Sequence, residues 1–334
     1  MQKTFRSPGA IMRPAHDHML PGVAANGPGW KPHLLLREQL PVNGDRSRPV
    51  LYIHGATFPS ATSILFKFEG LSWADSLNAA GFNVFGLDFA GYGGSERYPA
   101  MTGNQENVGE PLGRCAATVE QVERAVLFII KETGCTRISI IAHSWGTTVA
   151  GRFASQHPAI VDRLVLFGPI GLRHHPRSAR SLTPWTYITV DQQYARFVKD
   201  APRDAPVLVE TDFPRWAEAY LASDPTSRSR TPASVQTPNG PAADIGEAWC
   251  GSFPYDPSLI EAPTLIVRGA WDSTSATADM AWLKAALTAS PKVEDIIIPR
   301  ATHLMHLEDG RHALYAVTNA FLTEGSAAGG RVSA

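Results

Sequence analysis

The sequence predicts an α/β fold in which a mostly parallel central sheet is flanked by helices. Three observations support this prediction. Apolar runs of strand length alternate along the chain with segments of helical length. Several of these runs are β-branched and apolar throughout, as in parallel strands that are covered on both faces. The runs also end in serine, aspartate or histidine, so polar side chains are expected where the strands end. Strands and helices that alternate in this way form one sheet between two helical layers.

The predicted elements follow one another in a regular order. Strands are expected within residues 48–55, 82–95, 137–143, 161–167, 262–273 and 292–308. Helices are expected near residues 65–80, 116–133, 147–156, 274–290 and 310–323. The third of these helices should stop at His157, because Pro158 disfavours helical geometry in the residue before it. The glycines within residues 88–98 form a turn after a strand and do not match a nucleotide-binding G-x-G-x-x-G motif.

Residues 137–146 (RISIIAHSWG) are the most informative segment, since a strand leads there directly into a serine and then a helix. The segment is close to the motif G-x-S-x-G, with Ala142 in place of the first glycine and Gly146 as the second. A sharp strand-to-helix turn strains the backbone of such a serine and presents its Oγ at the edge of the sheet. Small residues flank the serine because the two backbones nearly touch. The segment therefore predicts that Ser144 is a nucleophile.

Composition and charge fit a globular enzyme. The 334 residues are 44% hydrophobic with a formal net charge of -1, so no nucleic-acid partner is expected. The first 25 residues lack the apolar core of a secretory signal, and no apolar stretch is long enough to span a membrane. Cys115, Cys135 and Cys250 are widely spaced and odd in number. This pattern favours reduced thiols in a cytoplasmic protein.

The order of these motifs resembles that of the α/β-hydrolase family over most of residues 30–324. The resemblance implies a cofactor-free hydrolase with a catalytic triad in the chain order serine, acid, histidine. It assigns the histidine to His303, just beyond the last strand, with the nearby His306 as the alternative. It assigns the acid to Asp272, because the preceding strand ends in FGPIGL, which has no carboxylate. An alternative role for Asp272 is to cap the helix that follows it.

The resemblance also implies backbone donors for the oxyanion that forms during nucleophilic attack. One donor is the N–H of Trp145, directly after the nucleophile. The other lies in the loop that follows His54, at Ala56 or, as the neighbouring option, at Thr57. The side chain of Trp145 could line the acyl pocket or pack against the sheet, and the sequence favours neither. His54 is expected to brace the loop.

The resemblance places a mainly helical cap at residues 171–255, between the two halves of the sheet. We therefore expect an N-terminal extension (residues 1–28), a hydrolase core (29–170 and 256–324), the cap and a flexible C-terminal tail (325–334). Within the cap, residues 223–244 are polar and rich in proline, which predicts a loop. A cap over the carboxyl ends of the strands would enclose the ligand crevice and set substrate selectivity.

The expected function is hydrolysis of a carboxylic ester through an acyl-enzyme, with a small-molecule ester as the partner. Candidate substrate-binding residues are Thr57, Arg173, Trp185 and Tyr187. A basic cluster of Arg173, His174, His175, Arg177 and Arg180 predicts either a solvated surface or recognition of a substrate carboxylate, as in a monoalkyl phthalate.

Other chemistries remain as alternatives or are disfavoured. No histidine pair has the spacing of a zinc site, so neither a metal nor a cofactor is expected. A serine nucleophile argues against haloalkane dehalogenases and epoxide hydrolases of the same fold. A hydrolase that cleaves carbon–carbon bonds of ring-fission products is the first alternative. A ligand-binding receptor of the same fold with slow turnover is the second.

Overall fold

The computed structural model describes residues 16–23, 29–102, 106–176 and 182–324. Its large sheet consists of β1 (His16–Leu20), β2 (Leu34–Gln39), β3 (Pro49–Ile53), β4 (Asn83–Leu87), β5 (Ile138–His143), β6 (Val161–Phe167), β9 (Thr264–Gly269) and β10 (Val293–Ile298). Five helices flank this sheet: α1 (Trp73–Ala79), α2 (Cys115–Thr133), α3 (Gly146–Gln156), α7 (Thr277–Ala286) and α8 (Arg311–Thr323). Every strand and helix predicted for the sheet layers is present.

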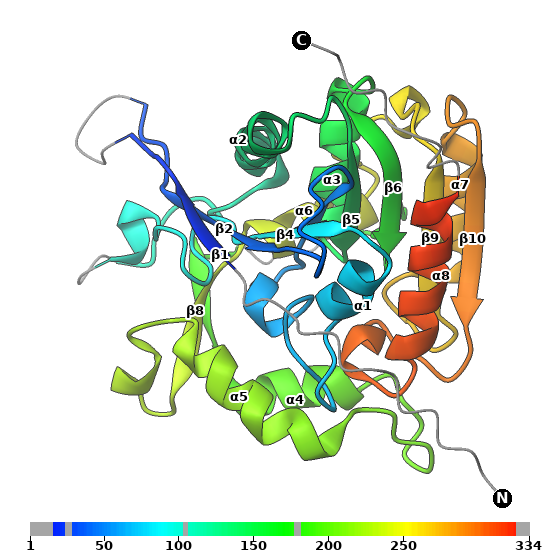
Figure 1. The fold of residues 1–334 in the computed structure, drawn as a ribbon. Coiled ribbons are helices and arrows are strands. Elements are labelled where there is room, and N and C mark those ends of the chain that lie inside the picture. The colour runs from blue at the N-terminus through cyan, green and yellow to red at the C-terminus, as the bar shows by residue number, and fades with distance from the viewer. Residues whose placement is uncertain (1–15, 24–28, 103–105, 177–181, 325–334) are drawn as a thin grey trace, which may run out of the picture.

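The strand order is β1-β2-β4-β3-β5-β6-β9-β10 (Figure 1). All pairs from β4 to β10 in this order are parallel. The pairs β1–β2 and β2–β4 are antiparallel. The structure therefore confirms the predicted fold class, a mostly parallel sheet between helices.

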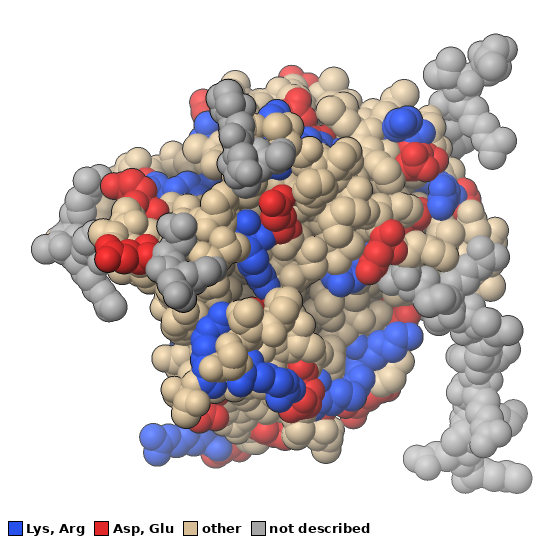
Figure 2. Space-filling view, turned by 90° about the vertical axis from the view of Figure 1, so that its left-hand side faces the viewer, with Lys and Arg blue, Asp and Glu red and all other residues tan. Residues whose placement is uncertain are grey.

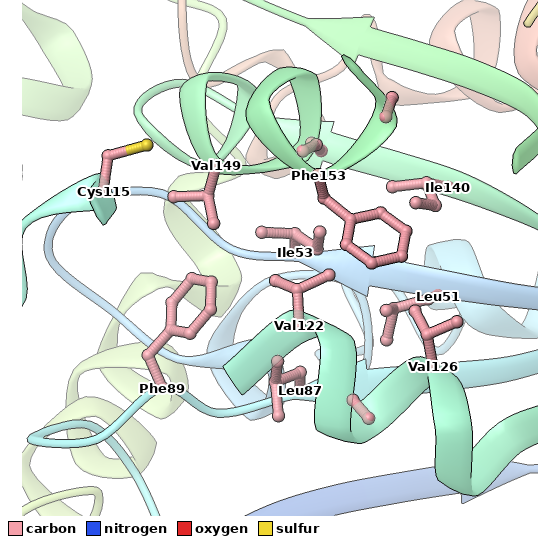
Figure 3. Close-up of a cluster of buried hydrophobic side chains, with 14 of the residues drawn as sticks. Leu51, Ile53, Leu87, Phe89, Cys115, Val122, Val126, Ile140, Val149 and Phe153 are labelled. Atoms are coloured by element: carbon pink, nitrogen blue, oxygen red, sulfur yellow. The ribbon is translucent and has the colours of Figure 1, made fainter. Parts of the chain in front are cut away.

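The sheet has a separate apolar core on each face, because successive residues of a strand point to opposite sides. Leu51 and Ile53 of β3 belong to the core under α2, α3 and α7, whereas Val50 and Tyr52 belong to the core under α1 and α8. Figure 3 shows side chains of α2 and α3, among them Phe153, pointing toward strand residues of the first core. Each fully buried side chain of this size stabilises the fold by about 1.5–3 kcal/mol.

The N-terminal part of the chain differs from the expected extension. Residues 16–20 form β1, which pairs with β2 along its whole length and adds an edge strand to the sheet. Polar contacts also tie this region to the core, since His18 of β1 contacts Glu38 of β2 and Asp17 of β1 contacts Arg37 of β2. The sheet thus begins before residue 29, where the core was expected to start. Residues 1–15 and 24–28, and the expected C-terminal tail, lie outside the described residues.

Residues 171–255 form a subdomain of their own elements between β6 and β9. They contribute β7 (Trp185–Thr189), α4 (Val190–Val198), α5 (Phe213–Ala222), β8 (Ser234–Pro238) and α6 (Gly240–Trp249). β7 and β8 pair as a small antiparallel sheet. In Figure 1, α4 and α5 lie on the side of the molecule toward which β6 and β10 point. We refer to residues 171–255 as the insert.

The prediction of a loop over residues 223–244 is wrong for the second half of this segment. Residues 234–238 form the buried strand β8, and α6 begins at Gly240. The cause is tertiary: β8 pairs with β7, and the buried carboxylate of Asp224 accepts a hydrogen bond from the Gln236 N–H at 2.9 Å. Such pairing overrides the low strand propensity of a polar, proline-rich sequence.

A third apolar core joins the insert to the rest of the protein. Phe197 of α4 and Trp216 of α5 are buried in it against Phe58. Leu304 and Leu307, which follow the last strand, complete the contact. The insert is therefore packed against the loops that follow β3 and β10, at the carboxyl ends of these strands.

The surface carries charges of both signs. Figure 2 shows Lys and Arg side chains next to Asp and Glu side chains on the face that bears β1 and β8. Arg228 pairs with Glu218, and Arg230 pairs with Asp224. Among the helices of the described residues, none is long and apolar enough to cross a membrane.

Candidate active site

Ser144 lies in a strained turn between β5 and α3. Its φ angle is 55°, in the left-handed region that residues other than glycine rarely adopt. β5 ends at His143 and α3 begins at Gly146. A Cβ on Gly146 would come within 2.8 Å of the carbonyl oxygen of Ile53 and still closer to that of His54, so only glycine fits. This close approach of strand and helix is the reason for the small residue in the predicted motif.

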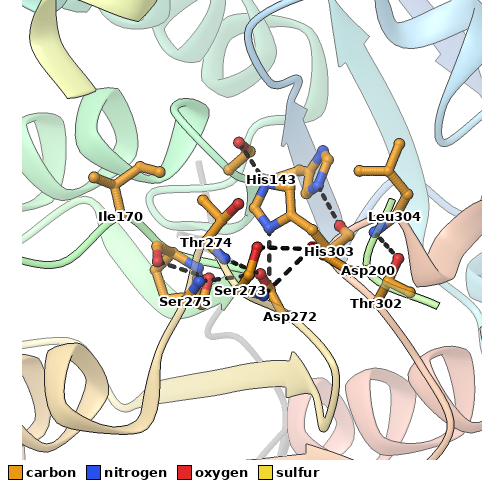
Figure 4. Close-up of polar contacts among 12 residues, drawn as sticks. His143, Ile170, Asp200, Asp272, Ser273, Thr274, Ser275, Thr302, His303 and Leu304 are labelled. Carbon is orange, nitrogen blue, oxygen red and sulfur yellow. Dashed lines mark hydrogen bonds and ion pairs between the residues drawn. The ribbon is translucent and has the colours of Figure 1, made fainter. Parts of the chain in front are cut away.

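Ser144, His303 and Asp272 form one chain of hydrogen bonds. The Nε2 of His303 is 2.8 Å from the Oγ of Ser144, and its Nδ1 is 2.9 Å from Oδ2 of Asp272. All three side chains are largely buried. Figure 4 shows the imidazole of His303 next to Asp272. The structure thus brings together three residues that lie 128 and 31 positions apart in the sequence, counted from Ser144 to Asp272 and on to His303.

The surroundings of Asp272 favour its ionised form. Burial alone raises the pKa of Asp272, but the charge of His303 and hydrogen bonds from His303 and Ser275 outweigh burial and lower the pKa. Its Oδ1 accepts backbone hydrogen bonds from Thr274 at 2.9 Å and from Ser275 at 3.0 Å. An ionised carboxylate can only accept, so Nδ1 of His303 carries a proton. Nε2 is then free to accept the proton of Ser144.

The alternative role of Asp272 as the cap of the helix that follows is wrong. The helix that follows, α7, has Ala276 as its N-cap, and Asp272 closes the turn before it. One carboxylate oxygen holds the turn and the other contacts His303. Local hydrogen bonding therefore fixes the orientation that the contact with the imidazole requires.

Gly168, directly after β6, leaves room for the imidazole. Its φ angle is 55°. A Cβ at this position would lie 2.9 Å from Nδ1 of His303 and 3.3 Å from Oδ2 of Asp272. Any side chain here would push against the contact between these two residues.

His306, the alternative to His303, is buried away from Ser144. Its ring packs against His143 at a centroid distance of 4.6 Å and stacks on Phe58 at 6.0 Å. Burial lowers the pKa of His306 to about 3, with a further contribution from the charge of His303. Within the described part of the chain, neither ring nitrogen has a hydrogen-bond partner. His306 is thus a neutral core residue in this structure.

Two further residues support His303, and the sequence patterns did not indicate either. Nε2 of His143 is 3.0 Å from the carbonyl oxygen of His303, which can only accept, so His143 donates this bond. Glu308 is fully buried and accepts hydrogen bonds from the backbone and the hydroxyl of Thr302. Burial raises the pKa of Glu308 to about 7.

The two predicted oxyanion donors lie beside Ser144. Trp145 follows it as the N-cap of α3, and Ala56 lies in the loop after β3. A Cβ on Gly55, the neighbour of Ala56, would be 3.1 Å from the Cβ of Ser144. No backbone hydrogen bond among the described residues uses the N–H of Trp145 or of Ala56. The carbonyl oxygen of Ala56 accepts a bond from the Tyr92 hydroxyl at 2.6 Å, which fixes this peptide.

The side chain of Trp145 packs in the core and is anchored by the insert. The indole is buried against Phe89, and its Nε1–H donates to Oδ2 of Asp244 at 2.9 Å. The same carboxylate accepts from the backbone of Cys115 at 2.7 Å and from Nε of Arg114 at 2.5 Å. Asp244 of α6 therefore joins the insert, the start of α2 and the residue after Ser144. The sequence does not indicate these contacts of Asp244, because it predicts a loop for this segment.

The predicted substrate-binding residues have other principal contacts. Thr57 is buried and its hydroxyl is 3.5 Å from Oε1 of Gln193. Trp185 is buried and its Nε1–H is 3.3 Å from the carbonyl oxygen of Ala100. Tyr187 is 46% exposed, and the guanidinium of Arg230 lies 4.4 Å from its ring centroid.

The guanidinium of Arg173 already has a carboxylate partner. It contacts Asp279 at 2.5 Å, donates to the Thr274 carbonyl at 2.8 Å and lies 4.3 Å from the Trp249 ring centroid. These contacts favour a structural role in holding the turn after Asp272 over recognition of a substrate carboxylate. Arg177 and Arg180, the other arginines of the predicted basic cluster, lie outside the described residues.

Metal-ligating groups are a further point of comparison with the sequence. In the portions of the chain that the structure describes, no group of three or more His, Cys, Asp or Glu is arranged to hold a metal ion. Cys115, Cys135 and Cys250 are free thiols.

Comparisons with known proteins agree with this architecture. The family model described as alpha/beta hydrolase fold matches residues 48–310. The thioesterase domain of the curacin biosynthetic pathway has a TM-score of 0.60 and 14% sequence identity, over 93% of this chain and 99% of that one. The 2-hydroxy-6-oxo-6-phenylhexa-2,4-dienoate hydrolase of Rhodococcus sp. strain RHA1 has a TM-score of 0.60 and 18% identity over the same shares.

A thermophilic esterase of Thermogutta terrifontis is similar at a TM-score of 0.55 and 18% identity, over 92% of this chain and 98% of that one. No match is found among curated proteins. At these identities the solved structures share the fold with this chain, and the residues of the site must carry any inference about its chemistry.

Proposed function

This chain belongs to the alpha/beta hydrolase fold family, and on that basis we propose that it is a serine hydrolase that cleaves a carboxylic ester through an acyl-enzyme. The observation that supports the proposal most is the hydrogen-bonded chain from Ser144 through His303 to Asp272. A serine hydroxyl is a weak nucleophile until a base within hydrogen-bond distance can take its proton, and the base needs a group that orients it.

In the proposed reaction, the Oγ of Ser144 attacks the ester carbonyl while Nε2 of His303 takes its proton. Asp272 stabilises the imidazolium, and the backbone N–H groups of Trp145 and Ala56 bind the oxyanion. The intermediate collapses as His303 returns the proton to the leaving alcohol, which leaves the acyl group on Ser144. Water, deprotonated by His303, then attacks the acyl-enzyme and releases the carboxylic acid.

We propose further that the insert acts as a cap. It packs on the loops that follow β3 and β10, and the Ser273 hydroxyl, next to Asp272, donates to Asp200 at 2.8 Å. An insert at this edge of the sheet can exclude water and shape the space for the acyl and alcohol groups. In this proposal residues 29–170 and 256–324, together with β1, form the hydrolase core.

Kinetics with p-nitrophenyl esters of varied acyl length test the proposed function. Ser144→Ala and His303→Ala should lower kcat by about three to four orders of magnitude or more, because each removes a member of one catalytic unit. Ser155→Ala is the matched control, since this hydroxyl lies on the same helix and donates to the Arg152 carbonyl at 2.9 Å. Its kcat should stay at the wild-type value.

Two outcomes would point to other functions. Consumption of a coloured dienoate substrate without ester turnover would favour carbon–carbon bond hydrolysis. Stoichiometric binding of ester without turnover by the wild-type protein would favour a receptor. Equal ester turnover by wild-type protein and Ser144→Ala would contradict the proposal.

A further inference from the structure

We infer that Arg196, on α4, binds a carboxylate of the substrate, so that the preferred ester carries a free acid group. This inference rests on the proposed hydrolase function. It follows from three features: α4 and the residues just after it span the candidate site, Arg196 is exposed beside the face of α4 that contacts the site, and its guanidinium has no acidic partner among the described residues.

Residues 193–200, which are part of α4 and the turn after it, contact both sides of the site. Gln193 is buried, and its side chain is 3.4–3.5 Å from the carbonyl and hydroxyl oxygens of Thr57, next to the predicted oxyanion donor Ala56. Asp200, two residues beyond the end of α4, accepts a hydrogen bond from the hydroxyl of Ser273 at 2.8 Å, next to Asp272. Residues 193–200 therefore cross the site from the oxyanion loop to the turn that carries the acid.

Arg196 lies on the face of α4 that makes these contacts. Gln193, Arg196 and Phe197 have the spacing i, i+3, i+4, which places them on one side of α4. Gln193 and Phe197 are buried on this side, but Arg196 is exposed. It lines a hollow of about 380 Å³ between α4 and β7. The other lining residues of this hollow belong to β7 and to the exposed side of α4, so Arg196 lies where the face that packs on the site meets an open space that a ligand could enter.

The charge of Arg196 acts on two residues around Ser144, Tyr92 and His143. Burial raises the pKa of Tyr92 well above its ordinary value, and the charge of Arg196 opposes this rise. The hydroxyl of Tyr92 holds the carbonyl of Ala56 at 2.6 Å. Burial likewise lowers the pKa of His143, and the charge of Arg196 adds to this effect. The ring of His143 is 5.1 Å from that of His303.

The positive charge of Arg196 is not balanced by the protein around it. The insert pairs Arg173 with Asp279, Arg215 with Asp212, Arg228 with Glu218 and Arg230 with Asp224. No ion pair or hydrogen bond of the described residues includes Arg196. The groups that act most on its charge are the phenols of Tyr220 and Tyr92. An arginine that lines a hollow and has neutral neighbours is suited to bind an anion.

A carboxylate is the anion that fits best. A guanidinium can donate two parallel hydrogen bonds to a carboxylate. A single arginine balances one negative charge, whereas a phosphate monoester carries about 1.5 to 2. The ester that suits this site is thus a half-ester of a dicarboxylic acid, or an ester whose alcohol part bears a carboxylate.

Matched ester pairs test the inference on both sides of the scissile bond. p-Nitrophenyl hydrogen adipate and p-nitrophenyl hexanoate differ by a carboxylate on the acyl side, and 4-acetoxybenzoate and phenyl acetate differ by one on the leaving group. Each pair gives a ratio of kcat/KM, anionic over neutral. In Arg196→Gln this ratio should fall at least about tenfold for one pair, which corresponds to about 1.4 kcal/mol. Arg196→Lys should give an intermediate ratio, since it keeps the charge and loses the planar fork.

Arg203→Gln is the matched control, because Arg203 is an exposed arginine of the same insert just beyond α4. Its ratios should equal those of the wild-type protein. Ratios that stay unchanged in Arg196→Gln, or that fall equally in Arg203→Gln, would overturn the inference.

A binding measurement keeps the inference separate from the proposed function. Calorimetry should detect monomethyl adipate bound to the wild-type protein and at least about tenfold weaker binding to Arg196→Gln. If neither ester pair is hydrolysed but this difference is found, the proposed function fails and the anion site stands. If esters are hydrolysed but both proteins bind monomethyl adipate equally, the inference fails and the proposed function stands.

Discussion

At the scale of single residues, the candidate site depends on two positions whose backbone has positive φ angles. Ser144 and Gly168 both have a φ of 55°. The backbone of Ser144 is strained by this conformation, and the turn places its Oγ 2.8 Å from Nε2 of His303. Glycine is required at position 168 for two reasons: the φ angle is positive, and the missing side chain leaves space for the imidazole of His303. Strain of this kind persists only where the surrounding structure enforces it.

Gly168→Ala, compared with a control variant, distinguishes the effect of the positive φ angle from the effect of the space left for the imidazole. The new Cβ would lie 2.9 Å from Nδ1 of His303, so we expect His303 to shift and the contact with Asp272 to break. Loss of that contact should lower kcat by two orders of magnitude or more, given that a misplacement of about 1 Å can cost about 100-fold. Steady-state kinetics together with chemical denaturation measure both effects.

Gly134→Ala is the control for backbone strain. Gly134 ends α2 with a φ of 70°, and a Cβ there meets no atom within 4 Å. Both variants should lose about 1–2 kcal/mol of unfolding free energy through the positive φ. Only Gly168→Ala should lose activity. Equal activity in the two variants would show that Gly168 does not position His303.

At the scale of elements, the insert reaches the site through α6 as well as α4. Asp244 of α6 accepts hydrogen bonds from the Trp145 indole and from the backbone of Cys115. This buried carboxylate fixes the residue whose backbone N–H is the proposed oxyanion donor. The packing of a distant helix thus bears on the geometry next to Ser144.

Trp145→Phe tests this connection, because it removes the indole N–H and keeps an aromatic ring. The buried carboxylate of Asp244 loses one of its donors, which should cost about 1–3 kcal/mol of unfolding free energy. We also expect kcat to fall about tenfold or more while KM changes little, since an oxyanion donor acts in the transition state. Urea denaturation and steady-state kinetics provide the two values.

Trp185→Phe is the matched control for this change. It also removes a buried indole N–H, which is 3.3 Å from the Ala100 carbonyl, and this contact does not involve Asp244. Its kcat should remain at the wild-type value. A kcat that falls equally in both variants would mean that Asp244 contributes to stability alone.

The elements differ in how far the sequence predicts them. The apolar runs of β3, β5 and β9 are buried along their whole length, and β6 is buried except at Asp162 and Arg163, so their composition alone identifies them. β7 and β8 could not be found in this way. β8 (SVQTP) owes its strand conformation to pairing with β7 and to the bond from Gln236 to Asp224, both of which are tertiary.

At the scale of the whole molecule, topology brings the candidate site together. β5, β6, β9 and β10 lie side by side in parallel, so the residues that follow them meet at one edge of the sheet. Ser144, Asp272 and His303 were predictable because each follows an apolar strand in the chain order of the family. The contacts of Asp244 and Glu308 and the proposed role of Arg196 were not, because they depend on tertiary packing that no sequence pattern indicates.

The most direct test of the proposed mechanism is the site and rate of covalent labelling by a fluorophosphonate, which reacts with activated serines. Mass spectrometry of the digested wild-type protein should locate one adduct per chain, on the peptide that contains Ser144. In His303→Ala the labelling rate should fall by about three orders of magnitude or more, because no base takes the serine proton. An adduct on another serine, or labelling of Ser144 at the wild-type rate without His303, would contradict the mechanism.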